Sequence, residues 1–373
     1  MTAGAWRIHL PWTTLVPIVA FGALLLSWGH TPPPGVLALE AVLLIGSVMA
    51  AVNHAETIAH RIGEPFGSLV LAVAVTIIEV GLIVMLMTAG NGGTSTLARD
   101  TVFSAVMLTI NGIVGISLMV GATKYKLAVF NPEGTGSMLA SVMLLAVLTM
   151  VLPDVTTSDA HGAFSPVQLA FAGVASLVLY GSFVFTQTIR HRDFFLPAQD
   201  IQPEATEDGT VDTEGPHAYR PSARATVTSL VVLLIALVSV VGLAKTESPA
   251  IEAGVRWLGL PISFVGVILA MVVLLPESIA AVRAAAQNRT QISMNLGFGS
   301  AMASIGLTIP TMAVISIWMP GKLTLGLTPI QIVLLAASGV VAVLTVVPGR
   351  AKTLHAIVHL VLLAAFIFFS MVP

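Results

Sequence analysis

Long apolar stretches, separated by short polar segments, run through almost the whole chain. A helix needs roughly 17–25 mainly apolar residues to cross the hydrocarbon core of a bilayer. Eleven candidate stretches are found, of which the fifth is short: 12–28, 36–53, 66–88, 101–121, 137–152, 166–188, 226–244, 260–282, 294–319, 328–346 and 353–371. The pattern predicts an all-α polytopic membrane protein with about 11 transmembrane helices.

One polar segment, 190–225, interrupts this pattern in the middle of the chain. It carries seven acidic residues among Pro, Gly and Thr, and such a composition cannot bury a hydrophobic core. We interpret it as an acidic cytoplasmic linker between a first membrane half at 36–189 and a second at 226–373, with an N-terminal helix in 1–35. Each half holds five predicted helices, and an odd number turns the second copy upside down. The sequence therefore predicts two inverted five-helix repeats.

The composition agrees with a chain whose main solvent is lipid. Hydrophobic residues make up 56% of the sequence and charged residues 9%, against about 25% charged in typical soluble domains. The lipid bilayer is therefore the expected partner, and a net charge of −2 argues against nucleic acid as a partner. The chain has no cysteine, so no disulfide is expected. Nothing in the pattern fixes an oligomeric state.

Lys and Arg are distributed unevenly between alternate polar segments. Twelve fall in the segments that share a side with the N-terminus, and four fall on the other side, at Arg99, Lys245, Arg256 and Lys322. Positive residues concentrate on the cytoplasmic side of membrane proteins. This asymmetry predicts a cytoplasmic N-terminus and, with eleven helices, a C-terminus outside.

One glutamate is buried in an apolar stretch of each half. Glu79 lies midway along the third stretch and Glu277 within the eighth, whereas Glu40, near the start of the second, is expected at the membrane interface. A carboxylate deep in a bilayer costs roughly 2.5–3.5 kcal/mol on insertion scales and usually marks an ion or proton pathway. The alternative is structural pairing with a basic residue, but apart from His355 and His359 no basic residue falls in the middle of a stretch. The pattern favours an ion site.

Two segments resemble the repeats of a known family. Residues 61–69 (RIGEPFGSL), followed by Glu79, are similar to the first alpha-repeat of calcium/proton antiporters in the calcium:cation antiporter superfamily. Glu277, followed by 288–294 (NRTQISM) and Ser300, is similar to the second alpha-repeat. Together with the eleven-helix plan and the acidic linker, the resemblance covers nearly the whole chain.

The widespread Gly-Asn-Ala-x-Glu signature of that superfamily is absent here. Residues 75–78 (VTII) precede Glu79, and residues 273–276 (VLLP) precede Glu277. The chain therefore resembles the bacterial branch, some members of which exchange sodium or potassium for protons. The resemblance implies a multi-pass protein of the cell inner (plasma) membrane that has no resident cofactor and transports calcium and protons.

The chemistry of two buried carboxylates agrees with this interpretation. Calcium is a hard cation that takes 6–8 oxygen ligands, and two carboxylates cancel its double charge in a medium of low dielectric constant. Without the metal, the two like-charged and poorly solvated carboxylates of Glu79 and Glu277 favour protons instead. Competition between the cation and protons for one pair of acids produces antiport.

The remaining ligands are expected to be neutral oxygens. Thr76 lies one helical turn before Glu79, and Pro276 lacks an amide hydrogen, which leaves the carbonyl of Val272 without its helical partner. Glu64, at the cytoplasmic start of its stretch, is a candidate gating carboxylate. The adjoining stretches offer the amides and hydroxyls of Asn111, Asn295, Ser300, Ser304 and Thr308, the last three at four-residue spacing.

These observations predict a secondary active transporter that exports calcium from the cytoplasm in exchange for protons. A sodium/proton or potassium/proton antiporter is the alternative. An intramembrane hydrolase would need a nucleophile or a metal centre, and the absence of cysteine, of paired aspartates and of a His-Glu-x-x-His motif argues against it. A channel would need a selectivity-filter-like loop, which the sequence lacks.

Overall fold

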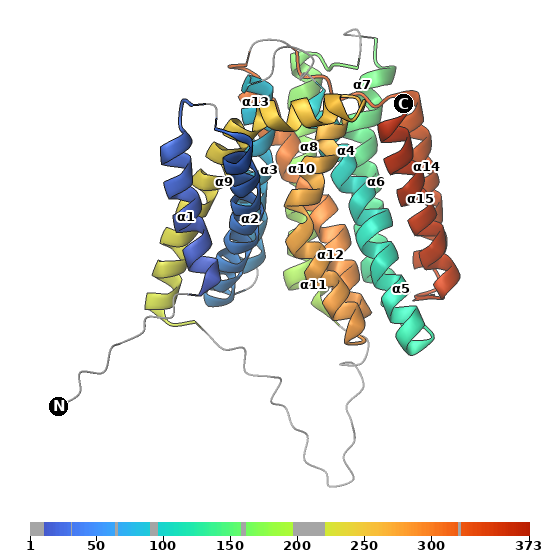
Figure 1. Ribbon diagram of the computed structural model, residues 1–373. Coiled ribbons are helices and arrows are strands. Elements are labelled where there is room, and N and C mark those ends of the chain that lie inside the picture. The colour runs from blue at the N-terminus through green and yellow to red at the C-terminus, as the bar shows by residue number, and fades with distance from the viewer. Residues whose placement is uncertain are drawn as a thin grey trace, which may run out of the picture.

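The structure is a computed structural model that describes residues 11–30, 32–63, 66–89, 96–157, 162–196, 221–319 and 322–373. Glu64, the candidate gating residue, lies outside the described residues, and so does 197–220 of the predicted acidic linker. The described residues form a bundle of long helices that run side by side, with the ends of the helices gathered at two opposite faces (Figure 1).

The two halves of the chain have the following elements. α1 (Trp12–Ser27) is the separate N-terminal helix. The first half comprises α2 (Pro34–Ile62), α3 (Phe66–Ala89), α4 (Leu97–Met107), η1 (Leu108–Ile113), α5 (Val114–Tyr125), β1 (Ala128–Val129), α6 (Pro132–Ala146), η2 (Val147–Val151), α7 (Leu152–Val155), α8 (Pro166–Phe185), η3 (Thr186–Arg190) and η4 (Arg192–Phe195). The second comprises α9 (Ala223–Trp257), α10 (Phe264–Val273), α11 (Leu275–Ala286), α12 (Thr290–Ala303), η5 (Ser304–Thr308), α13 (Ile309–Ile315), α14 (Pro329–Val346), β2 (Arg350–Ala351) and α15 (Thr353–Met371).

The all-α membrane architecture is confirmed. Within the described residues, nine helices are long and apolar enough to cross a membrane, and α10 with α11, bent by 55° at their junction, make a tenth. α1 has 16 residues, which is about 24 Å at 1.5 Å per residue, against a hydrocarbon core of about 30 Å. Eleven full crossings are therefore not confirmed.

Local sequence signals explain where several helices begin. α8 follows Ser165 and α14 follows Thr328, and each of these N-cap residues forms a capping box with a glutamine three positions later. A proline occupies the first turn in both cases, where its missing N–H has no helical partner to lose. In the second half, Pro276 lies in the first turn of α11, directly after the bend.

The third membrane helix of each half contains a π-helical segment. In the first half, η1 separates α4 from α5, and in the second half η5 separates α12 from α13. Such segments interrupt the regular hydrogen-bond ladder and occur frequently at functional sites. Each also faces the other half of the molecule, because α3 packs against η5 while α11 packs against η1.

Short backbone pairings connect the two halves in a reciprocal way. β1, after the third helix of the first half, pairs antiparallel with β2, before the fifth helix of the second half. Ala163, before the fifth helix of the first half, forms an antiparallel bridge with Thr324, after the third helix of the second half. Exchanging the two halves converts one pairing into the other, and α6 with α7 runs from one pairing to the other across the bundle (Figure 1). This is the relation expected of an inverted repeat.

The buried apolar side chains form two main clusters. One lies among α4–α8 and α12–α15, and the other among α1, α2, α3, α9 and α10. α3 contributes to both, with Ile83 in the first and Leu82 in the second, and α10 does the same with Val267 and Val265. These two helices therefore form the boundary between two packed bodies.

α10 can lie close to α4 because of a glycine. A side-chain carbon built on Gly266 would stand 2.8 Å from the backbone of Asp100 and Thr101, closer than van der Waals contact allows. Small residues at such positions let membrane helices approach one another. The contact fixes the second half's broken helix against the third helix of the first half.

Candidate functional site

Glu79, on α3, is held by hydroxyl groups from the opposite half of the chain. Its side chain is 3% exposed. Ser304 Oγ donates a hydrogen bond to Glu79 Oε1 at 2.5 Å, and Thr308 Oγ1 donates one to Oε2 at 2.8 Å. Both donors lie on η5, so the segment that departs from regular helix geometry fixes both oxygens of this carboxylate.

A cavity beside Glu79 brings several of the expected ligands together. It measures about 10 Å³, roughly the space that one water molecule needs. Thr76, Ser300 and Ser304 line it along with Glu79, and the rest of its wall is apolar. The Thr76 hydroxyl donates to the carbonyl of Ala72 at 2.8 Å. The lone pairs of the Thr76 oxygen therefore remain free to coordinate a cation. The cavity therefore offers a carboxylate and several hydroxyls within an apolar surround.

Glu277 lies at the break between α10 and α11. The chain bends at Leu274, and Glu277 follows in the first turn of α11, where the helix dipole favours a negative charge. Within the described part of the chain, its buried Oε2 has no hydrogen-bond partner. Negative charges on Glu79 and on Glu56, from α2, act on it. A buried carboxylate oxygen without a partner is costly unless a proton or a cation binds it.

The proline-containing break also carries residues that line the cavity. Val273 and Leu274 do so, whereas Val272, the residue with the predicted free carbonyl, is not among the lining residues. Pro276 is buried and does not line the cavity either. The residues at the break that reach the cavity are therefore Val273 and Leu274.

The two asparagines expected as ligands lie in other hydrogen-bond networks. Asn295 donates from Nδ2 to the carbonyl of Phe195 at 2.6 Å and accepts from Gln291 at 2.8 Å. Asn111 donates to Ser338 Oγ at 2.8 Å. Neither asparagine lines the cavity beside Glu79. Spacing in the sequence puts them on the correct helices but does not show which way they face.

Asn111 belongs to a buried polar network that the sequence analysis does not anticipate. Its Oδ1 lies 3.1 Å from His359 Nδ1, and His359 Nε2 lies 3.2 Å from Thr345 Oγ1. The network also includes Ser338 and connects η1, α14 and α15. The available sequence signal is a polar residue near the middle of each of these helices.

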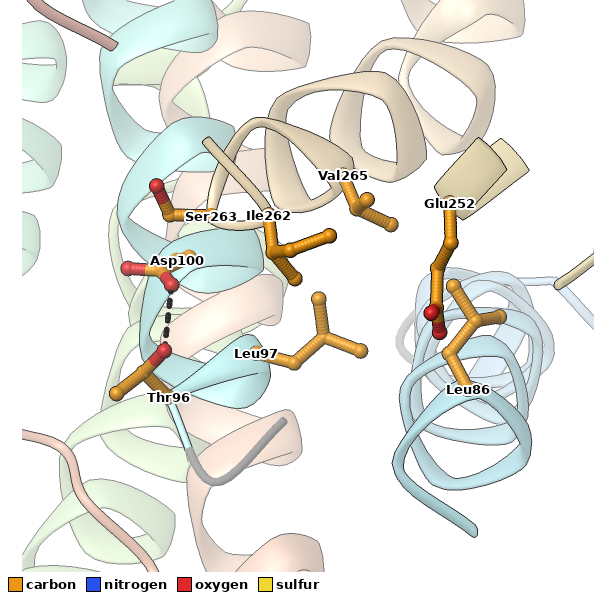
Figure 2. A pocket seen from close by; sticks show the side chains of 8 residues that line it. All are labelled: Leu86, Thr96, Leu97, Asp100, Glu252, Ile262, Ser263 and Val265. Carbon is orange, nitrogen blue, oxygen red and sulfur yellow. Dashed lines mark hydrogen bonds between the residues drawn. The ribbon is translucent and has the colours of Figure 1, made fainter. Parts of the chain in front are cut away.

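A second small pocket lies where α4 begins, at the end of the bundle that also holds the end of α15 (Figures 1 and 2). Asp100 is buried there and accepts hydrogen bonds from Thr96 Oγ1 at 2.9 Å and from Arg99 Nε at 2.8 Å. Figure 2 shows Glu252, from α9, on the opposite wall, with the side chain of Ile262 between. This pocket is distinct from the cavity at Glu79.

Known sequences match this chain along both of its halves. The sequence profile described as sodium/calcium exchanger protein matches residues 33–189 and 228–372. A putative ionic transporter, y4hA of Sinorhizobium fredii, is 39% identical over 98% of this chain and 97% of its own length. The sodium-potassium/proton antiporter ChaA of Escherichia coli is 33% identical over 96% of each chain.

Solved structures share the fold at lower sequence identity. The native YfkE structure superposes with a TM-score of 0.70 at 16% identity and covers 97% of this chain and 99% of its own. The H⁺/Ca²⁺ exchanger CAX gives a TM-score of 0.66 at 16% identity, covering 96% and 91% respectively. At this identity, the likeness establishes the fold.

Proposed function

The chain belongs to the sodium/calcium exchanger protein family, a family of membrane cation antiporters, and from this premise we propose that it exports calcium from the cytoplasm in exchange for protons. The observation that carries the proposal is the paired arrangement of Glu79 and Glu277. Glu79 is fixed at a cavity that Thr76, Ser300 and Ser304 also line. Glu277 is not among the lining residues, but one of its oxygens has no hydrogen-bond partner among the described residues, and the charge of Glu79 acts on it.

Cation and protons compete for this pair. Two carboxylates, with the hydroxyls of Thr76, Ser300 and Ser304, offer the oxygen ligands and the charge that a calcium ion needs. When the cation leaves, two buried like charges cannot both remain ionised without cost, and protons replace it. The apparent affinity for the cation should therefore rise with pH, because fewer protons compete at high pH.

Alternating access is proposed to occur at the boundary between the two packed bodies. α3 and α10, which contribute to both apolar clusters, carry Glu79 or lead directly into the helix that carries Glu277. Sliding of one body against the other would change which end of the bundle the carboxylates face. The two ranges that match the family profile support treating the halves as repeats related in this way.

The orientation is proposed from charge. The end of the bundle where α1 and α9 begin (Figure 1) carries most of the Lys and Arg side chains, among them Arg61, Lys124, Arg283, Arg289 and Lys352. Arg99, Lys245, Arg256 and Lys322 belong to the opposite end. The positive-inside rule supports placing the first end in the cytoplasm of a bacterial cell and the C-terminal Pro373 outside the inner membrane.

A monovalent cation is the second candidate substrate. ChaA of Escherichia coli, described as a sodium-potassium/proton antiporter, is 33% identical over 96% of this chain. The two asparagine amides expected as ligands are engaged elsewhere, which leaves fewer oxygens at the cavity. A site with fewer ligands suits sodium better than a site built for the high coordination number of calcium.

The deciding experiment uses everted membrane vesicles energised to be acid inside. Collapse of the pH gradient is recorded after separate additions of calcium, sodium and potassium, with Glu277→Gln measured alongside. Collapse by calcium that the variant abolishes supports calcium/proton antiport through this pair. Collapse by sodium or potassium alone supports the second candidate. If none of the three ions collapses the gradient, proton-coupled transport of these cations is excluded.

A further inference from the structure

A further buried carboxylate is held at the end of the bundle where α1 ends and α2 begins (Figure 1). Glu40, on α2, was expected at the membrane interface, yet its side chain is 0% exposed because α1 and α9 cover it. Ser27 Oγ, from α1, donates to Glu40 Oε1. Thr246 Oγ1, from α9, lies 3.3 Å from Glu40 Oε2 and also lies within hydrogen-bond distance of the Leu243 carbonyl, at 2.8 Å. Three helices therefore meet at this one carboxylate.

Glu247 adds a second carboxylate from α9, next to Thr246. It is 4% exposed, and among the described residues its buried Oε1 has no hydrogen-bond partner. Glu247 directly follows Thr246, whose hydroxyl lies 3.3 Å from Glu40 Oε2, and the negative charge of Glu40 acts on Glu247. The neighbouring Ser248 hydroxyl is buried and likewise has no hydrogen-bond partner in the described part of the chain.

This cluster is separate from the Glu79 and Glu277 pair. Glu56, which acts on Glu277, lies on α2 sixteen positions after Glu40, which is about 24 Å along a helix. The basic residue nearest in sequence, Lys245, points to the Trp28 ring, with Nζ 4.9 Å from the ring centroid.

We propose that Glu40 and Glu247, with the hydroxyls of Ser27 and Thr246, form a second binding site for a hard cation, calcium being the ion that their combined charge fits. Two buried like charges without a counter-ion are unfavourable, and hard cations take carboxylate and hydroxyl oxygens. The unpartnered oxygen of Glu247 supplies the open ligand position. A cation bound there connects α1, α2 and α9 at the end of the bundle that lies opposite the positively charged end.

The test removes the central pair first, so that its outcome is independent of the transport mechanism. Purified Glu79→Gln/Glu277→Gln protein is titrated with ⁴⁵Ca²⁺ by equilibrium dialysis, and thermal unfolding is followed with and without calcium. We expect one saturable site per chain and a higher melting temperature in calcium, because a ligand that binds only the folded state stabilises it. Adding Glu247→Gln should weaken binding by about tenfold or more.

The matched control is Glu252→Gln, on the same helix, whose carboxylate pairs with Arg256 at 3.2 Å; it should leave binding unchanged. If Glu247→Gln fails to fold, Glu40→Gln should weaken calcium binding in the same way. A folded Glu79→Gln/Glu277→Gln protein without saturable calcium binding overturns the proposal, and so does binding that survives the further loss of both Glu40 and Glu247.

A luminescent probe locates the site. Tb³⁺ also takes hard oxygen ligands and emits when energy is transferred from a nearby tryptophan, and Trp28 directly follows Ser27. In the same background, Trp28→Phe should reduce the sensitised emission at saturating Tb³⁺ while dialysis shows unchanged calcium binding. Emission that does not depend on Trp28 would place the bound ion elsewhere and contradict the assignment.

Discussion

Glu79 and Glu277 occupy corresponding positions in the two halves, but their surroundings differ. Glu79 lies on the uninterrupted helix α3, and both of its oxygens accept hydrogen bonds from η5. Glu277 lies just after a 55° bend, and its Oε2 has no hydrogen-bond partner among the described residues. Hydrogen bonds fix the first carboxylate as a positioned ligand, whereas the second depends on a cation or a proton to satisfy it. The two halves therefore place a glutamate at corresponding positions but give the two carboxylates different roles.

The largest effect is expected from neutralising either carboxylate. Glu79→Gln and Glu277→Gln should each insert and fold, yet reduce transport to the vesicle background, a loss of about 100-fold or more, because one acid cannot both balance the cation and exchange it for protons. Transport is measured as ion-dependent collapse of the pH gradient. Glu133→Gln, an exposed acid at the start of α6, is the control, and substantial activity in either central variant would contradict the mechanism.

The next largest effect should come from removing the hydroxyls that hold Glu79. Ser304→Ala with Thr308→Val deletes the two hydrogen bonds that position the carboxylate. It should weaken the apparent cation affinity by about 10- to 100-fold, which corresponds to roughly 1.4–2.8 kcal/mol. Initial transport rates are measured against cation concentration. Thr311→Val is the matched control because that hydroxyl bonds back to Leu307 on its own helix. An unchanged affinity in the double variant would show that Glu79 needs no fixed position.

A smaller effect is expected at the bend that precedes Glu277. Pro276→Ala restores an N–H that can bond the carbonyl of Val272 and so straighten the chain between α10 and α11. The maximal transport rate should fall several-fold, while the apparent affinity changes less. Pro329→Ala, at the ordinary start of α14, controls for loss of a proline in general. A rate equal to that of the natural protein would mean that the break is not needed for turnover.

The smallest effect on transport should come from Asn111, although it lies in the segment of the first half that corresponds to η5. Asn111→Ala removes one hydrogen-bond partner each from His359 and Ser338, which keep Thr345 and the Leu334 carbonyl respectively. It should destabilise the fold by about 1–2 kcal/mol, which a lower melting temperature would report. The apparent cation affinity should stay within about twofold. A large loss of affinity would instead make η1 a ligand segment and remove the difference between the two halves.

The difference between Ser304 and Asn295 shows which features of the site can be predicted from the sequence. Both are polar residues on the same predicted stretch, and both are reasonable ligands by residue type. The structure places the Ser304 hydroxyl on Glu79, whereas the Asn295 amide bonds to the backbone of Phe195. The two residues are nine positions apart, and at about 100° per residue they lie on opposite faces of a regular helix. Residue type alone makes both of them candidate ligands, and only the packing of this helix against α3 shows which face meets Glu79.

The sequence by itself determined the membrane class, most of the helices, the position of one glutamate within an apolar stretch of each half, and the family. These follow from short-range properties, namely apolar length, proline and capping residues, and the cost of a charge in lipid. Only the tertiary structure decided which side chains meet. It joined Glu79 to η5 of the other half, directed Asn111 to His359 and buried Glu40 against Ser27 and Thr246. Such contacts depend on how helices far apart in the chain pack and turn toward one another, and hydropathy along a single helix does not record that.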